Sequence, residues 1–370
     1  MIARLLIPLL ALFLTLSARA ADVPPDAAPP QMEVVFVLDT TGSMAGLLEG
    51  AKAKIWSIAN EIMKSAPKPD LKIGLVAYRD KGDTYVVQVT DLTRDLDNVY
   101  GILLKLKADG GGDTPENVRQ ALHEALTKIS WSKGKGVFKT VFLVGDAPPH
   151  MDYADVPTVE DLCLSAVKAD VLINTVRCGG DGETGRIWQK IASSSEGTYL
   201  SIAQDGGVEA VPTPFDKELG DLSDRVGRTL VPFGAAEARD GLLRMETEAA
   251  GAPAPAKADR ACFKAAEGGR LHDADLLDAI REGRTKLGDL KAGELPAEIR
   301  DKGPKEQKAW LDAKLKERGE LQARILEVSK KRDEYLVQEL AKRDRKDGFD
   351  DVVKETLRKQ AAARGILLGK

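Results

Sequence analysis

The chain has 370 residues, of which 43% are hydrophobic, so it can bury one full core and has room for two domains. Its net charge of -4 is unevenly spread, because residues 259–370 hold 27 Lys and Arg against 23 Asp and Glu, which leaves residues 1–258 at -8. The acidic N-terminal part argues against a nucleic-acid-binding protein.

The N-terminal segment has the features of a secretory signal. Arg4 precedes an apolar stretch from Leu5 to Leu16, and Ala18-Arg19-Ala20 has the small-residue pattern of a cleavage site. We therefore expect a signal peptide at 1–20, a linker at 21–31 and an exported mature protein, periplasmic or extracellular, with no stable membrane insertion. The alternative is an uncleaved anchor, but the stretch is shorter than the roughly 20 residues that a span needs.

Strand and helix patterns alternate through residues 32–235. Apolar runs predict six strands, the second and third of which form a hairpin, and three- and four-residue apolar spacing predicts the helices between them. The fold class is therefore α/β, with a doubly wound, mainly parallel, Rossmann-like sheet covered by helices on both faces. The strands are expected at 33–39, 71–80, 84–92, 138–146, 171–178 and 197–202, and the helices at 47–66, 98–108, 116–129 and 159–170.

Oxygen-bearing side chains follow the predicted strands. Asp39 ends the first strand and is followed by Thr41 and Ser43, Asp146 ends the fourth, and Asp113 and Thr114 lie in a glycine-rich loop. Ligands of such sheets bind at the carboxyl ends of the strands, where the strand order reverses. A set of oxygen ligands favours Mg²⁺, or alternatively Mn²⁺ or Ca²⁺, over zinc or copper.

These segments resemble the von Willebrand factor A-type (VWA) domain. DTTGS resembles its DxSxS motif, with Asp39, Thr41 and Ser43 as ligands, while GGGDTPE and GDAPPH resemble its second and third metal loops, the latter with Asp146. The resemblance implies a metal-ion-dependent adhesion site (MIDAS) whose cation captures a carboxylate of a protein partner. Two positions depart from the pattern: Thr41 replaces serine, and Asp113 stands where threonine is common, with Thr114 as the alternative ligand.

Other roles are open for some of these residues. Asp39 and Asp113 could simply cap helices, with Pro115 at the first helical position, and capping is compatible with metal binding. His150 and Asp152 could add a ligand at the rim of the site, although a loop histidine is usually only solvated. An enzyme is not expected, since the chain lacks the P-loop lysine and has Thr41 where aspartyl phosphohydrolases need a second carboxylate.

Three cysteines are present, at positions 163, 178 and 262. In an exported protein, Cys163 at a helix start and Cys178 at a strand end could form a disulfide at one edge of the fold, or they could be two buried thiols. A zinc site is not expected without paired Cys or His spacing.

The C-terminal part differs in composition from the VWA-like region. Residues 212–231 are expected to form the closing helix of the VWA domain (32–235), residues 236–258 a linker, and residues 259–370 a charged helical region. Leu321, Ile325, Val328 and Tyr335 fit a short coiled coil, but Arg332 at an inner position favours a helix packed on its neighbours. Two functions follow: a metal-dependent protein-binding module, or a scaffold that acts through the helical region.

Overall fold

The computed structural model describes residues 29–65, 67–134, 136–207, 211–266, 270–342 and 348–368. The predicted signal peptide, 1–20, lies outside the described residues. Within them, no helix combines the length and the apolar composition that crossing a membrane requires.

A single mixed sheet in the described residues confirms the predicted fold class. Its order is β3-β2-β1-β4-β5-β6, with only β3 antiparallel to its neighbour. The chain builds outward from β1 on one side and from β4 on the other, so the strand order reverses between these two. The strands are β1 (Gln31–Asp39), β2 (Asp70–Tyr78), β3 (Val87–Thr93), β4 (Phe138–Gly145), β5 (Leu172–Cys178) and β6 (Tyr199–Ile202).

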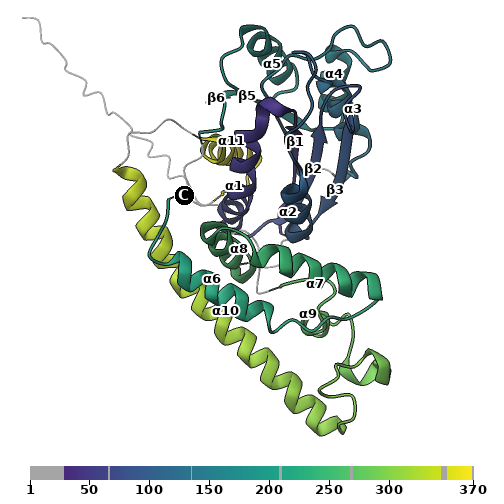
Figure 1. Ribbon diagram of the computed structural model, residues 1–370, viewed down its shortest axis with the longest axis vertical. Coiled ribbons are helices and arrows are strands. Elements are labelled where there is room, and N and C mark those ends of the chain that lie inside the picture. The colour runs from purple at the N-terminus through teal and green to yellow at the C-terminus, as the bar shows by residue number, and fades with distance from the viewer. Residues whose placement is uncertain are drawn as a thin grey trace, which may run out of the picture.

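Helices cover both faces of the sheet (Figure 1). Val34, Phe36 and Leu38 of β1 pack with α1 and α2, whereas Val35 and Val37 face α3, α4 and α5. This division follows from the alternation of side chains along a strand. The helices are α1 (Ala45–Met63), α2 (Leu96–Lys105), α3 (Val118–Thr127), α4 (Val159–Lys168) and α5 (Gly182–Ser194), and the 3-10 turn η1 (Gly42–Met44) precedes α1.

A second helical body lies below the sheet domain in Figure 1. Its core joins α6, α8 and α10 through residues such as Leu222, Cys262 and Ile325. The predicted closing helix, now α6, therefore packs in this body and not on the sheet. The elements are α6 (Asp216–Gly227), α7 (Ala236–Ala250), α8 (Ala254–Ala266), α9 (Leu276–Arg281), η2 (Leu287–Asp289), η3 (Ala292–Glu294) and α10 (Pro304–Ala341).

Residues 236–258 are helical where a linker was predicted. They contain all of α7 and the beginning of α8. Alanine is the strongest helix former, Pro255 falls in the first turn of α8, where proline is tolerated, and Leu242 and Met245 are buried. The composition of this segment therefore favours helix once apolar anchors are available.

Helix α10 packs within the chain, as the position of Arg332 predicts. Leu321, Ile325 and Val328 are buried against α6 and α8. Arg332 is 5% exposed, and its guanidinium lies 2.7 Å from Asp216 and 2.6 Å from Asp259. The apolar stripe that suggested a coiled coil is thus covered by helices of the same chain.

The last helix, α11 (Phe349–Ala363), returns to the sheet beside α1 (Figure 1). Phe349, Val353 and Leu357 are buried in the same core as Phe36 and Phe142, and the rings of Phe36 and Phe349 lie 6.2 Å apart. The end of the predicted helical region therefore covers part of the sheet.

Buried contacts also join the helical body to the sheet domain. Trp56 of α1 lies between Tyr100 of α2 and Phe263 of α8, at 5.5 Å from each ring. Asp97 of α2 is 1% exposed and pairs with Arg260 at 2.6 Å and with Lys264 at 2.8 Å. An ion pair this deeply buried holds the helical body in one position on the sheet domain, because breaking it would leave an unpaired charge buried away from water.

Of the two alternatives that the sequence leaves open for Cys163 and Cys178, the disulfide is absent. All three cysteines are free and buried. Cys163 belongs to the core on the α3–α5 side of the sheet and Cys178 to the core on the α1 side, so the sheet separates them. The alternative of buried thiols holds.

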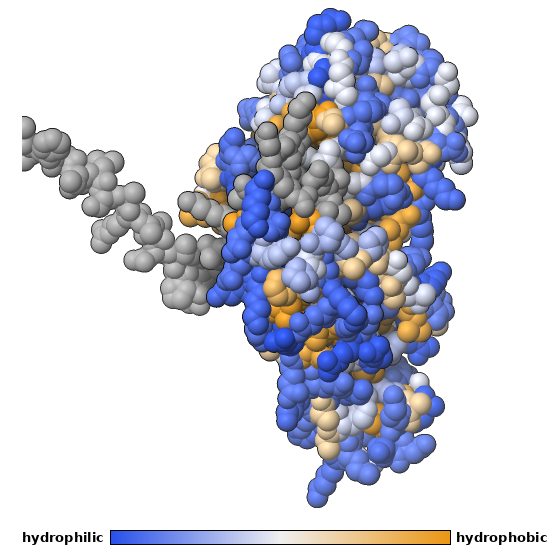
Figure 2. Space-filling model, turned by 60° about the vertical axis from the view of Figure 1, so that its left-hand side comes forward, coloured by the Kyte–Doolittle hydropathy of each residue, from blue (hydrophilic) through white to orange (hydrophobic). Residues whose placement is uncertain are grey.

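Hydrophilic residues cover most of the surface seen in Figure 2. The hydrophobic residues on that face form separate patches, which is ordinary for a protein surface. Exposed large apolar side chains include Leu243 and Leu367.

Replacing Phe349 with alanine should lower the free energy of unfolding of the full chain by about 3–5 kcal/mol, since it leaves a cavity against Phe36. Urea unfolding measures the change. Leu367→Ala, at a side chain that is 70% exposed, is the matched control and should stay near the wild type. Equal stability of both variants would show that α11 does not belong to the sheet core.

Candidate functional site

Asp39 is buried at the carboxyl end of β1 with one oxygen held and one free. Its Oδ1 accepts hydrogen bonds from the Thr41 backbone N–H at 2.8 Å and from Thr41 Oγ1 at 2.6 Å. Its Oδ2 is buried and has no hydrogen-bond partner. Thr41 Oγ1 lies 3.4 Å from Ser43 Oγ, and Ser43 is exposed in the 3-10 turn η1. The three predicted first-loop ligands therefore stand together.

Asp146 follows β4, the strand next to β1, and its negative charge raises the pKa of Asp39. Asp146 Oδ2 accepts a hydrogen bond from Gln204 Nε2 at 2.5 Å. The preceding Gly145 lets the strands approach, because a Cβ there would lie 3.1 Å from Asp39 Oδ2 and 2.5 Å from the Tyr78 hydroxyl. We call Asp39, Thr41, Ser43 and Asp146 the Asp39 site.

Glu116 adds a carboxyl group that sequence reasoning missed. It is 3% exposed, and a Cβ at Gly111 would lie 3.3 Å from Glu116 Oε1 and 3.4 Å from Thr41 Cβ. Its Oε2 is buried without a hydrogen-bond partner. Glu116 stands in the GGGDTPE segment, but there it resembles an ordinary helix-start residue, and only the fold turns it inward.

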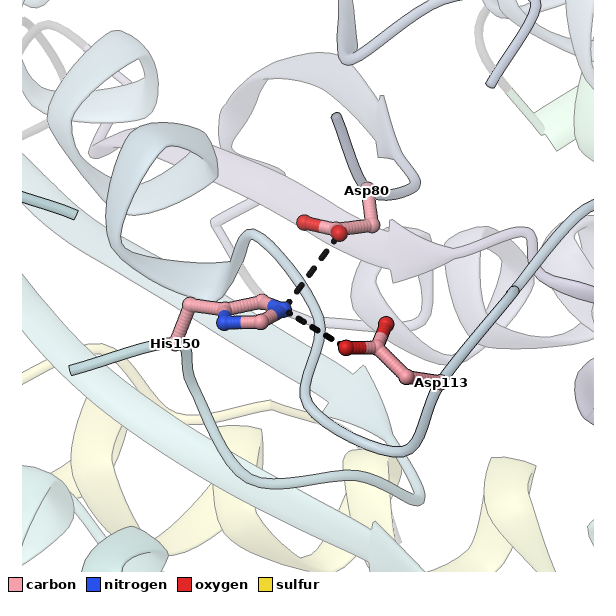
Figure 3. Close-up of side chains that lie close together, drawn as sticks. All are labelled: Asp80, Asp113 and His150. Carbon is pink, nitrogen blue, oxygen red and sulfur yellow. Dashed lines mark ion pairs between the residues drawn. The ribbon is translucent and has the colours of Figure 1, made fainter. Parts of the chain in front are cut away.

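Asp113 and Thr114 are exposed on the second loop. The carboxylate of Asp113 lies 3.7 Å from His150 Nε2, and that nitrogen is 3.3 Å from Asp80 Oδ2 (Figure 3). Within the described residues, these three are the one group of three or more His, Cys, Asp or Glu side chains whose ligand atoms all lie within 4.8 Å of one another. We call Asp80, Asp113 and His150 the His150 cluster; Asp80 was not predicted from the sequence.

The electrostatics of the Asp39 site call for a cation. Burial raises the pKa of Asp39 from 3.8 to about 7, against the hydrogen bonds from Thr41, and the charge of Asp146 adds to the rise. Burial raises the pKa of Glu116 to about 9, with contributions from Asp39 and Asp80. The nearby guanidinium of Arg79 lowers the pKa of Asp39 only in part. It also donates to the Lys107 carbonyl and lies over the Tyr85 ring.

The donor set fits a hard divalent cation. The site offers carboxylate and hydroxyl oxygens, and two buried carboxyl oxygens, Asp39 Oδ2 and Glu116 Oε2, have no hydrogen-bond partner. A buried polar atom without a partner is costly and needs an explanation such as an ion. Magnesium, manganese and calcium take oxygen ligands of these kinds.

Residues 33–214 match the sequence profile of the family described as von Willebrand factor A domain. The von Willebrand factor A domain-containing protein 7 of Rattus norvegicus is 29% identical over 202 residues, which are 54% of this chain and 21% of that protein. The protein of the same name in Mus musculus is 37% identical over 97 residues, 26% of this chain and 10% of that protein. The matched parts of this chain thus span about a fifth or less of these relatives.

Among solved structures, the crystal structure of the SpRpn10 VWA domain aligns with 47% of this chain and 88% of that chain, at 17% identity and a TM-score of 0.37.

Asp39→Asn should raise the free energy of unfolding of the metal-free protein at pH 8 by about 1–4 kcal/mol. Between pH 3.8 and about 7 the folded state holds a proton on Asp39 that the unfolded chain has already released. The contribution of this group to stability therefore falls across that range and is fully lost by pH 8. Denaturant unfolding at pH 8 and pH 5 in EDTA measures the gain, which should shrink at the lower pH.

Asp181→Asn is the matched control, because Asp181 also accepts from a threonine backbone and hydroxyl, at an exposed helix start. Its pKa is lowered by those bonds, so this substitution should not stabilise the protein. A gain of the same size in both variants would contradict the account given for Asp39.

Proposed function

Because residues 33–214 of the chain are a von Willebrand factor A domain, we propose that the protein binds a protein partner through a divalent cation at the Asp39 site. Domains of this family commonly mediate metal-dependent protein interactions and are typically not enzymes. The observation that carries the proposal is the free, buried Oδ2 of Asp39 at the edge of the sheet where the strand order reverses.

Asp39, Asp146, Thr41 and Ser43 would supply the ligands, with the loop of Asp113 and Thr114 at the rim. The rigid strand β1 and the two hydrogen bonds from Thr41 orient Asp39, which suits Mg²⁺ because this ion demands near-ideal ligand geometry. Mn²⁺ and Ca²⁺ are alternatives with the same preference for oxygen.

The charge balance supports capture of an acidic partner. In the metal-free site the pKa of Glu116, about 9, favours its neutral form at pH 7, and the Asp113 carboxylate lies beside His150. Two carboxylates, Asp39 and Asp146, then neutralise one divalent ion. The cation keeps room for a further anionic oxygen, which a glutamate or aspartate of the partner would provide.

Export of the protein and the roles of its two parts are also proposed. We infer an exported protein with a VWA domain at 32–235 and a helical region at 259–370 that positions it. The scaffold function, in which metal only stabilises the fold and the helical region makes the contacts, is the competing outcome of the tests below.

Calorimetry on the full chain should show Mg²⁺ binding that Asp39→Ala abolishes and Asp181→Ala preserves. The full chain is needed because α11 contributes Phe349 to the sheet core, so a chain shortened to the VWA domain would lack part of that core. Equal binding by wild type and Asp39→Ala would place the ion elsewhere.

Partner chemistry is tested on a peptide array in which each Asp- or Glu-containing peptide stands beside its Asn or Gln counterpart. With Mg²⁺ present, the wild type should prefer the acidic member at least about 10-fold, as expected for one metal-bound carboxylate worth about 1.4 kcal/mol or more. EDTA and Asp39→Ala should each remove the preference. Acidic binding that survives both would favour a scaffold surface outside the Asp39 site.

A further inference from the structure

The His150 cluster has the geometry of a metal site of a different kind. His150 Nε2 points at Asp80 Oδ2 and Asp113 Oδ2, at 3.3 Å and 3.7 Å (Figure 3). Ligand atoms at about 2.0–2.1 Å from a tetrahedral zinc ion are about 3.4 Å apart. The two distances from Nε2 are therefore close to those between ligands of one ion, and the ligand atoms of the three residues all lie within 4.8 Å of one another.

The other ring nitrogen of His150 is already oriented. Nδ1 lies 2.9 Å from Asp152 Oδ1, so in the tautomer that carries its proton on Nδ1 the ring donates to this carboxylate. Metal-binding histidines ordinarily donate their second nitrogen to such a group. With that tautomer the lone pair of Nε2 faces two carboxylates, an arrangement that a cation between them would stabilise, and this buried nitrogen has no hydrogen-bond partner.

Asp80 is held in the same way. It is 6% exposed, and the Tyr153 hydroxyl donates to its two oxygens at 3.0 Å and 2.9 Å. The Tyr153 ring stacks on His150 with centroids 4.2 Å apart. Two of the three ligands are thus fixed, while the Asp113 side chain, 62% exposed, marks the open side through which an ion would enter.

Lys81, which follows Asp80 in the chain, does not take the place of a metal ion. Lys81 lies over the Tyr153 ring, 4.1 Å from its centroid, and its ammonium pairs with Asp155 at 2.7 Å. The positive charge that the two carboxylates of the cluster call for is therefore not supplied by this side chain.

We propose that Asp80, Asp113 and His150 form a second metal site, which prefers a borderline transition ion such as Zn²⁺ to Mg²⁺. Imidazole is a good ligand for zinc and cobalt, whereas Mg²⁺ prefers oxygen and water. Asp152 and Tyr153 act as positioning residues that orient His150 and Asp80. The chain would then hold two ions of different chemistry at neighbouring loops.

Co²⁺ is the probe, because its visible absorption reports coordination by the protein, and Zn²⁺ is then added to displace it. Full-length protein should bind Co²⁺ with a tetrahedral-type spectrum, and His150→Ala should weaken binding by about 100-fold or more. Asp152→Asn should weaken it by about 10–100-fold through loss of ring orientation. His123→Ala, in α3, is the control histidine and should bind as the wild type.

The two sites separate in a crossed experiment. Asp39→Ala should lose Mg²⁺ and keep Co²⁺, while His150→Ala should keep Mg²⁺ and lose Co²⁺. Circular dichroism checks folding, and the backbone N–H of residue 150, which donates to the Glu116 carbonyl at 3.0 Å, remains in the variant.

Three outcomes would overturn the proposal. Co²⁺ binding unchanged in His150→Ala would exclude this nitrogen as a ligand. Co²⁺ binding lost only in Asp39→Ala would assign the ion to the Asp39 site. Absence of Co²⁺ and Zn²⁺ binding by the wild type, with nuclear magnetic resonance showing a protonated His150 ring, would replace the metal by an ion pair with Asp80.

Discussion

The close approach of β1 and β4 is the constraint on which the site depends. A Cβ at Gly145 would lie 2.5 Å from the Tyr78 hydroxyl and 3.1 Å from Asp39 Oδ2, so a side chain there would push the strand ends apart. That approach brings the buried Asp39 near the partly buried Asp146, and burial together with the charge of Asp146 raises the pKa of Asp39. The protein thus holds a buried carboxyl group whose Oδ2 has no hydrogen-bond partner, and a bound cation would stabilise its charged form.

The strands and the first loop could be predicted because their signals are local. Five apolar residues before Asp39 define a buried strand, and DTTGS fixes the residues after it. Glu116 and Asp80 were missed because their roles depend on contacts between loops that are far apart in the sequence. The choice between a disulfide and two buried thiols stayed open for a similar reason, because the sequence does not show that the sheet lies between Cys163 and Cys178.

Buried charges set the arrangement of the helical body. Arg332 between Asp216 and Asp259, and Asp97 between Arg260 and Lys264, each require a particular alignment of helices. Apolar packing alone tolerates sliding, whereas a desolvated charge that loses its partner costs several kcal/mol. Such pairs explain why charge-rich sequence after residue 235, which looks like solvated helix, folds against the VWA domain.

The return of α11 to the sheet has a consequence for the order of events during synthesis. Phe36 and Phe142 leave the ribosome long before Phe349, which covers them in the folded protein. Contacts between such distant parts of a chain form late and slow folding. Until translation is nearly complete, the nascent sheet therefore exposes the apolar surface that α11 later covers. A chaperone could bind this surface during that interval.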